Sequence, residues 1–313
     1  MPQLLTGTQL AQNIKLLLSQ KRKEIFKDKK VYLAIIFVGE NNPSQVYVKN
    51  KQQYARDIGL EAIVFGQGGQ EIKADFLYLS PLLETKYSTK EEILSLIKTL
   101  NADKNCMGII CQLPLTEALQ DAKDVLCTAI SPLKDVDGLG GILNGWNLQD
   151  IITFQPATAK AILDLRDYHQ LGSRKGRKIA IIGMGNLIGK PLAIEAVKRG
   201  AIVQTFTVED KKALIAEKCR ECEIIISCTG AIHLVDASFI NKQKDQIIID
   251  AGYGFLNGKA TGDVNFEEVA PLVKAITPVP GGIGPLTVAS LFGNIFILQE
   301  QKDLIQTLGN TLL

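Results

Sequence analysis

The sequence predicts an α/β protein of two lobes, a first α/β lobe and a second lobe built on a doubly wound parallel sheet, with a cleft between them. Three observations favour this fold class. The 313 residues exceed what one hydrophobic core usually holds. Short β-branched runs alternate with helix-like segments in both halves of the chain. A glycine-rich turn follows the first strand of the second half, as in doubly wound folds.

The alternation also predicts where the lobes begin and end. We assign residues 1–150 to the first lobe and residues 151–286 to the second. A connecting helix is expected within residues 147–165. The segment 287–312 predicts a last helix, and we expect residues 287–313 to pack back on the first lobe.

The first lobe has clear strand and helix signals. Residues 31–38 form a β-branched and apolar run, as expected of a buried parallel strand. Asn42 as an N-cap and Pro43 at the first helical position predict a helix that ends near Gly59. Residues 60–65 then predict a second strand.

The next segment, residues 66–87, is irregular and carries no predicted element. Ser88 and Glu91 form a capping box that predicts the start of a helix. A strand is expected at residues 107–111.

The second lobe alternates strands and helices at short intervals. Its predicted strands are residues 178–182, 201–207, 223–227 and 246–250, with helices that end near Arg199 and Arg220.

Charge and composition exclude several classes of function. The 35 basic and 33 acidic residues are spread along the chain, so there is no electrostatic footprint for nucleic acid or an anionic membrane, and a small-molecule partner is expected. The N-terminus lacks the features of a signal peptide, and no uninterrupted apolar run approaches membrane-spanning length. We therefore expect a cytoplasmic protein.

The six cysteines predict reduced, buried thiols. Cys219 and Cys222 form a C-x-x-C pair, but the chain has no second pair at zinc-ligand spacing. The only histidines, His169 and His233, lie far from it in sequence. Core packing explains this pair, and we expect no metal.

One helix face in the first lobe could hold a flat heterocycle beside a proton donor. Ser44, Tyr47 and Lys51 are spaced i, i+3, i+7 on the helix that starts at Pro43. Taken alone, this face fits a solvated lysine beside a half-buried tyrosine better than it fits a site.

Loops of the first lobe add groups that could meet this face. Gln112 lies just past the end of a buried strand and before Pro114, at the edge where open α/β sheets bind ligands. Asp135 and Asp137 lie in the glycine-rich loop SPLKDVDGLGG. A carboxylate there could accept two hydrogen bonds from an aminopyrimidine, although an isolated aspartate of this kind more often caps a turn or helix. Near the C-terminus, the rigid loop ITPVPGGIGPLT could order around a ligand at low entropic cost.

The segment IAIIGMGNLIGKPLA carries a dinucleotide signal. Gly183, Gly185 and Gly189 follow a strand and open a helix, with the third glycine one residue later than in G-x-G-x-x-G. The turn alone is a weak to moderate signal, and its placement between strand and helix favours a Rossmann-type domain. The free N–H groups of the helix would face a pyrophosphate.

Taken together, four segments resemble the bifunctional methylenetetrahydrofolate dehydrogenase/methenyltetrahydrofolate cyclohydrolase family. They are VGENNPSQVYVKNK, ICQLPL, PLKDVDG and TPVPGGIGPLT, in the family's order over nearly the whole chain. Chance agreement of all four is negligible.

The resemblance implies roles for individual residues. Lys51 matches the catalytic lysine, and Gln112 the glutamine that orients it. Tyr47 matches a tyrosine that packs against the folate, and Asp137 the aspartate that anchors the pterin. Further residues of the implied folate site are Ser44, Gly282, Pro285 and Thr287. The implied dinucleotide site comprises Gly183, Met184, Gly185, Asn186, Gly189, Thr207, Val208, Glu209, Thr229 and Gly230.

The implied reaction has two steps, and the implied assembly is a homodimer through the second lobe. Hydride passes from methylenetetrahydrofolate to a nicotinamide, and water then attacks the methenyl cation to give 10-formyltetrahydrofolate. An ammonium beside a cation disfavours its own charged form, so Lys51 could act as a neutral base or relay for that water.

Departures from the family concentrate in the second lobe. The arginine that would face a 2′-phosphate is Met184, and Thr207 and Val208 replace a histidine and a serine. Glu209 or Asp210 instead offers a carboxylate where NAD-binding domains bind the ribose 2′-OH, and its charge would repel the extra phosphate of NADP. We expect NAD or NADP as cofactor, with NAD favoured.

Two further departures lie elsewhere. QPATAK replaces the usual P-C-T-P-x-G, with Thr158 retained, and residues 66–87 look like an insertion that could reshape the cleft or a subunit contact.

The sequence leaves three alternative functions open. A cyclohydrolase that has kept Lys51, Gln112 and Asp137 but lost effective dinucleotide chemistry would be distinguished by titrating NAD and NADP. A non-enzymatic folate-binding protein would need neither the lysine nor the glutamine. A hydroxy-acid dehydrogenase would leave the motifs of the first lobe unexplained.

Overall fold

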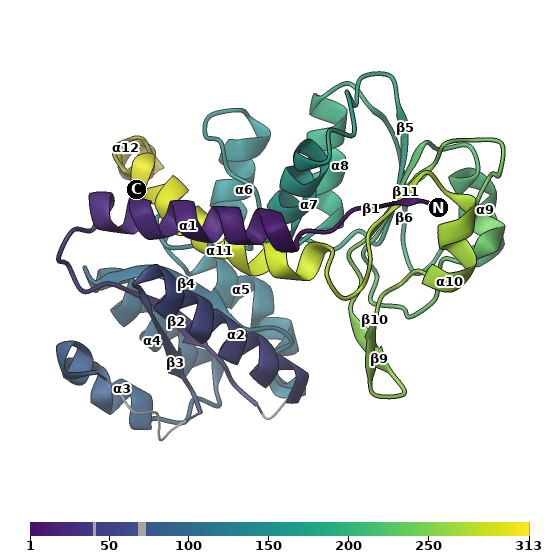
Figure 1. Ribbon diagram of the computed structural model, residues 1–313. Coiled ribbons are helices and arrows are strands. Elements are labelled where there is room, and N and C mark those ends of the chain that lie inside the picture. Colours follow the sequence, from purple (N-terminus) through teal and green to yellow (C-terminus); the bar gives the residue numbers. More distant parts are fainter. Residues whose placement is uncertain (40–41, 68–72, 313) are drawn as a thin grey trace. The chain divides into compact units, whose positions relative to one another are not determined.

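The computed structural model describes the chain except residues 40–41, 68–72 and 313, and the side chains of residues 42–44 and 310–312 (Figure 1). The chain forms two compact units. The first lobe comprises Asn13–Phe154 and Leu291–Leu313, and the second comprises Met1–Gln12 and Gln155–Ser290.

We expected the N-terminal residues to belong to the first lobe, but Met1–Gln12 belong to the second. Strand β1 (Gln3–Leu4) pairs in parallel with β11 (Ala275–Ile276) at the edge of the second-lobe sheet. A two-residue strand with both residues exposed carries no pattern that sequence reasoning can detect.

The first lobe is built on a three-stranded parallel sheet of order β3-β2-β4. Its strands are β2 (Tyr32–Ile36), β3 (Glu61–Phe65) and β4 (Cys106–Cys111). All five residues of β2 are buried, because helices cover both faces of a parallel sheet. The predicted helix after β2 is confirmed as α2 (Asn42–Ile58).

Helix α4 (Lys90–Ala102) begins one residue later than predicted. Its capping box is formed by Thr89 and Glu92. The Glu92 carboxylate accepts the backbone N–H of Thr89 at 3.0 Å and also that of Ser88 at 2.9 Å. Both Ser88 and Thr89 are suitable capping residues, and the sequence pattern could not separate them.

The described part of segment 66–87 completes the hydrophobic core of the first lobe. It contains η1 (Ala74–Leu79) and α3 (Ser80–Glu84). Phe76, Leu83 and Tyr87 are buried in the cluster that also holds Tyr32 and the inner face of α4. The Phe76 ring meets the Tyr32 ring edge-on at a centroid distance of 5.3 Å. The described part of this segment is therefore a structural cover of the sheet.

The remaining helices of the first lobe differ from prediction at the C-terminus. They include most of α1 (Thr8–Ile25), then η2 (Glu117–Ala122), α5 (Lys123–Thr128) and α6 (Gly141–Leu148). The predicted last helix is two helices, α11 (Ile283–Glu300) and α12 (Lys302–Leu312). Within the described residues, α11 alone has the length and apolar composition of a membrane span, and most of it is buried, as in a core helix.

The second lobe contains a six-stranded parallel sheet of order β1-β11-β8-β7-β5-β6. The predicted strands are confirmed as β5 (Lys178–Ile182), β6 (Ile202–Phe206), β7 (Ile224–Ser227) and β8 (Ile247–Asp250). The connecting helix expected within residues 147–165 is α7 (Ala157–Tyr168), which begins inside that range and ends three residues beyond it. Helices α7 and α8 (Gly189–Lys198) lie on one side of the sheet, and α9 (Lys212–Cys219) and α10 (Phe266–Val269) on the other (Figure 1).

Smaller elements complete the second lobe. These are the antiparallel hairpin of β9 (Gly254–Leu256) and β10 (Lys259–Thr261) and the short helices η3 (Ala237–Phe239) and η4 (Ala270–Leu272).

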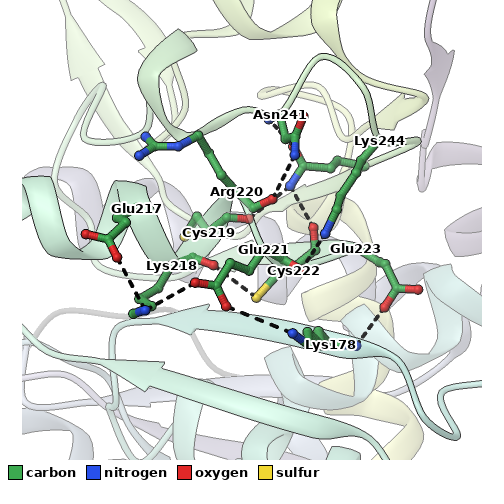
Figure 2. Close-up of polar contacts among 11 residues, drawn as sticks. Lys178, Glu217, Lys218, Cys219, Arg220, Glu221, Cys222, Glu223, Asn241 and Lys244 are labelled. Atoms are coloured by element: carbon green, nitrogen blue, oxygen red, sulfur yellow. Dashed lines mark hydrogen bonds and ion pairs between the residues drawn. The ribbon is translucent and has the colours of Figure 1, made fainter.

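The C-x-x-C pair is part of the second-lobe core, as predicted. Cys219 and Cys222 are fully buried free thiols, and burial raises their pKa values to about 12 and about 11. In Figure 2, the Cys222 thiol donates to the carbonyl of Lys218 at 3.5 Å, and the side chain of Lys218 bridges Glu217 and Glu221. In the described part of the chain, no group of three or more His, Cys, Asp or Glu side chains could hold a metal ion.

Candidate active site

Helix α2 presents one face with Tyr47, Lys51 and Tyr54, because residues i, i+4 and i+7 share a side of a helix. Tyr47 and Lys51 are partly buried. Tyr54 is buried and stacks on Phe292 of α11 at a centroid distance of 5.1 Å, which fixes this face within the first lobe. Ser44 lies on the same helix, and its side chain is outside the described residues.

The end of β4 brings Gln112 to this helix face. Lys51 Nζ donates a hydrogen bond to Gln112 Oε1 at 2.8 Å. The amide Nε2 of Gln112 donates to the carbonyl of Leu113 at 2.9 Å, and its backbone N–H donates to the carbonyl of Ile36 at 2.8 Å. Since the amide nitrogen has its own acceptor, the amide oxygen is directed at the lysine. Gln112 is 8% exposed, so this orientation is held inside the fold.

The loop after α5 supplies a carboxylate to the same site. Burial raises the pKa of Asp137, and the positive charge of Lys51 opposes that shift. The reciprocal effect acts on the lysine, where burial lowers the pKa of Lys51 and the Asp137 charge opposes the shift. The two groups are therefore close enough to interact electrostatically. Lys51, Gln112 and Asp137, predicted from three separate segments, come together in the first lobe.

Asp135, the other aspartate of this loop, is not available to a ligand. It is 2% exposed, and its carboxylate accepts the backbone N–H groups of Gly138, Leu139 and Gly140 at 3.0, 3.3 and 2.7 Å. Its role is the capping role that such a motif has most often. By closing the loop, Asp135 sets the position of Asp137.

Sequence reasoning missed Asn294, which supports the same loop. Its side-chain Nδ2 donates to the carbonyl of Val136 at 2.8 Å, between the two aspartates, and the residue is fully buried in α11. The available signal was a lone amide inside the apolar run LFGNIFIL. A buried polar side chain needs a partner, and here the partner is the backbone of the site loop.

The glycine-rich turn of the second lobe is shaped for a close approach of backbone and ligand. Gly183 has φ of +100°, and a Cβ there would lie 2.7 Å from the carbonyl oxygen of Cys228. A Cβ on Gly189 would lie 1.8 Å from the carbonyl oxygen of Gly183. Gly185 is exposed, and a Cβ added to it would meet no neighbouring group within 4 Å. Gly183 and Gly189 thus permit tight packing of the turn, and Gly185 leaves open space beside its backbone.

The loop after β6 begins beside this turn, since the N–H of Gly183 donates to the carbonyl of Phe206 at 2.9 Å. The Asp210 carboxylate accepts the backbone N–H of Thr207 at 2.8 Å, so it is engaged within the loop. Glu209 is exposed, and so is Val208, at 91%. Of the two acids offered by the sequence, Glu209 is the exposed one.

Other predicted residues also lie in the second lobe. Thr229 and Gly230 follow β7, next to the glycine-rich turn, where a Cβ on Gly183 would lie 3.2 Å from Thr229 Cγ2. Met184 is partly exposed and Asn186 exposed on that turn.

The C-terminal loop, predicted to line the folate site, also belongs to the second lobe. The carbonyl oxygen of Gly282 packs against Gly7, where a Cβ would lie 2.2 Å from it. Pro285 and Thr287 lie in the first turns of α11, and Thr287 Oγ1 donates to the carbonyl of Ile283 at 3.3 Å.

Comparisons with known proteins agree with both lobes. Residues 5–137 match the family "Tetrahydrofolate dehydrogenase/cyclohydrolase, catalytic domain", and residues 156–303 match "Tetrahydrofolate dehydrogenase/cyclohydrolase, NAD(P)-binding domain". The bifunctional protein FolD of Lactobacillus gasseri is 37% identical over 86% of this chain and 87% of its own length. The bifunctional protein FolD of Streptococcus agalactiae is 34% identical over 93% and 95%.

Solved structures show the same likeness. The bifunctional enzyme FolD of Campylobacter jejuni is 31% identical, with a TM-score of 0.83 over 96% of this chain and 100% of that one. The FolD of Trypanosoma brucei, solved with NADP and an inhibitor, is 25% identical, with a TM-score of 0.82 over 97% and 99%.

Proposed function

Because the chain belongs to the tetrahydrofolate dehydrogenase/cyclohydrolase family, we propose that Lys51, Gln112 and Asp137 form the reaction site for its folate substrate. The enzyme oxidises methylenetetrahydrofolate with a nicotinamide dinucleotide and hydrolyses the methenyl product to 10-formyltetrahydrofolate. The family predicted from the four sequence motifs is thus confirmed. The observation that carries the site assignment is the 2.8 Å hydrogen bond from Lys51 to Gln112 beside Asp137.

Hydrolysis needs a group that takes a proton from water next to a cationic substrate. The lowered pKa of Lys51 favours the neutral amine, which can accept that proton. The methenyl cation lowers the pKa further, because two positive charges repel. Water then adds to the methenyl carbon, and cleavage of the bond from that carbon to N5 leaves the formyl group on N10 and a proton on N5. Gln112 keeps the amine directed at the reacting carbon.

Asp137 has a separate task in this scheme. A partly buried carboxylate that accepts two N–H groups of the aminopyrimidine edge fixes the pterin in one orientation. Tyr47, four residues before Lys51 on the same face of α2, lies where it can pack on the ring. Together they hold the folate so that its one-carbon bridge meets the lysine.

The glycine-rich turn fits a dinucleotide, since Gly185 leaves its backbone open and α8 starts directly after the turn. A nicotinamide dinucleotide held there supplies the hydride acceptor for the first step. We further propose that NAD is preferred over NADP. The support is Glu209, exposed beside the turn, and Met184 in the place of a phosphate-binding arginine. A kcat/KM with NADP equal to or above that with NAD would contradict this preference.

A spectrophotometric assay of the purified protein tests the whole proposal. Methenyl formation is followed with each nucleotide, and its hydrolysis is then followed without nucleotide. We expect both reactions. Hydrolysis without any binding of NAD or NADP would favour a cyclohydrolase alone, and folate binding without turnover would favour a non-catalytic binding protein.

We also propose a homodimer formed through the second lobe. The support is a group of exposed apolar side chains at and near the β9–β10 hairpin, namely Ile232, Tyr253, Phe255 and Leu256. Light scattering should give twice the chain mass, and Phe255→Asp should shift the protein towards monomer. A cytoplasmic location stays a prediction.

A further inference from the structure

The second lobe contains two buried carboxylates that the reaction scheme does not use. Asp250 is the last residue of β8, and Asp263 lies two residues after β10. They are 3% and 0% exposed. Burial of an ionisable group is costly unless its oxygens accept hydrogen bonds. The donors to these oxygens therefore indicate what the two carboxylates hold in place.

One oxygen of Asp263 gathers three donors from the end of β7. Asp263 Oδ2 accepts hydrogen bonds from Ser227 Oγ at 2.8 Å, from the backbone N–H of Thr229 at 2.7 Å and from Thr229 Oγ1 at 2.9 Å. The Thr229 hydroxyl in turn accepts the N–H of Ala231 at 3.0 Å. These bonds fix the turn of residues 228–231, in which Gly230 has φ of +73°.

Asp250 fixes Asp263 through the backbone. Asp250 Oδ1 accepts the N–H of Asp263 at 3.1 Å and that of Gly252 at 2.9 Å, and Oδ2 accepts the N–H of Val264 at 3.0 Å. The packing is so close that a Cβ on Gly252 would lie 2.0 Å from Asp263 Oδ1. Burial and the neighbouring Asp263 charge raise the pKa of Asp250 to about 7, as expected of two carboxylates held side by side.

The turn that Asp263 holds lies beside the glycine-rich turn. Ile182, the last residue of β5, is in register with Ser227, the last residue of β7. A Cβ on Gly183 would lie 2.7 Å from the carbonyl oxygen of Cys228. The strand order reverses at β5, with β6 on one side and β7 on the other, and doubly wound sheets bind ligands at such a point. A dinucleotide on the glycine-rich turn therefore meets residues 228–231.

We propose that Asp263 is a positioning residue for dinucleotide binding, which acts by holding residues 228–231 through Thr229 and is itself held by Asp250. This inference rests on the proposed function, since it takes the dinucleotide as the ligand. Asp263 touches neither substrate nor cofactor in this scheme. Its charge strengthens the bonds to Thr229, because a hydrogen bond to an ionised acceptor is stronger than one to a neutral acceptor.

The structure offers a variant that changes the charge with little change of shape. Asp263 Oδ1 has no hydrogen-bond partner among the described residues. In Asp263→Asn, the amide oxygen can therefore keep the position of Oδ2, and the amide nitrogen can take the position of Oδ1. Asp236→Asn is the matched control, because Asp236 is in the same lobe and its carboxylate contacts the nearby Ser238 and Lys212.

The test is a calorimetric titration of NAD and NADP into the full-length protein and these two variants. We expect Asp263→Asn to raise the Kd of the preferred nucleotide about tenfold, because hydrogen bonds to a neutral amide oxygen are weaker than those to a carboxylate. The KM for that nucleotide should rise by a similar factor while kcat at saturation changes less. Methenyl hydrolysis and the thermal unfolding temperature show whether the variant is folded. Asp236→Asn should bind as the wild type does.

A second pair of variants covers the case in which Asp263→Asn does not fold. Thr229→Val removes the hydroxyl that joins Asp263 to Ala231, and Thr229→Ser keeps it. We expect weaker binding in the first and recovery in the second. Wild-type affinity in a folded Asp263→Asn, or equal affinity of the two Thr229 variants, overturns the inference while leaving the proposed function intact. A wild-type protein that binds neither nucleotide overturns both.

Discussion

The two candidate sites of this protein are built on different principles. In the first lobe, the site consists of side chains, with Lys51 bonded to Gln112 and balanced by Asp137. In the second lobe, the site consists of backbone turns. Asp263, from a distant segment, accepts the N–H of Thr229 in one turn, and Asp210 accepts the N–H of Thr207 within its own loop. Proton transfer requires titratable side chains, whereas a pyrophosphate is bound by N–H groups of the backbone. We therefore expect a change of one side chain in the first site to remove most of the catalytic rate. A single change in the second site should reduce nucleotide affinity only moderately.

The largest effect is expected at Lys51. Lys51→Met removes the proton acceptor and should reduce methenyl hydrolysis by about a thousandfold, within the range of general acid–base catalysis. Lys49→Met, the same change on the exposed side of α2, should leave the rate unchanged. The hydrolysis rate of each variant is the measurement, and an undiminished rate in Lys51→Met would remove the lysine from the mechanism.

The next effect is expected at Asp137, and it separates binding from proton transfer. Asp137→Asn should raise the KM for the folate about tenfold, through loss of charged hydrogen bonds. Because the Asp137 charge holds the pKa of Lys51 up, its removal should also move the rising limb of the pH profile of kcat to lower pH. Asp121→Asn, an exposed change in the same lobe, is the control. A profile that does not move would show that Lys51 does not titrate in the rate-limiting step.

A smaller effect is expected at Glu209, because we expect the glycine-rich turn to contribute most of the nucleotide binding. Glu209→Ser should raise the ratio of kcat/KM with NADP to that with NAD about tenfold, because a charge that repels the 2′-phosphate is lost. Glu217→Ser, another exposed acid of the second lobe, should not change the ratio. If both variants behave alike, Glu209 does not select the nucleotide.

The last effect is expected on stability, without a change in the reaction or in nucleotide binding. Burial raises the pKa of Asp135 to about 7, above its value of about 4 in the unfolded chain. A raised pKa means that the folded state binds more protons than the unfolded chain. The contribution of Asp135 to the free energy of unfolding is therefore present below about pH 4 and is lost as pH rises from about 4 to about 7. In Asp135→Asn, the free energy of unfolding should fall less steeply with pH than in the wild type, by up to about 1.4 kcal/mol per pH unit. Denaturant unfolding between pH 5 and pH 8 measures it, and parallel curves for wild type and variant would refute the assignment.

The sequence predicted the first-lobe site more completely than the second. Lys51, Gln112 and Asp137 each lie at a recognisable place, on a helix face, after a strand and in a glycine-rich loop. Asp263 lies far from Thr229 in sequence, and nothing in TGDVNF marks it as the partner of a turn after β7. Support from a distant segment leaves no local pattern that names the partner. Asn294 stands out locally as a lone amide in an apolar run, but its partner, the carbonyl of Val136, is equally distant in sequence.

The sequence by itself determined the alternation of strands and helices, the family, and the side chains that can do chemistry, because periodicity, capping and motif spacing are local properties of a chain. The tertiary structure decided which aspartate interacts with Lys51 and which acid after β6 stays exposed. It also decided that the described part of segment 66–87 completes the core of one lobe and that β1 extends the sheet of the other. Those outcomes depend on hydrogen bonds and packing between segments that folding alone brings together.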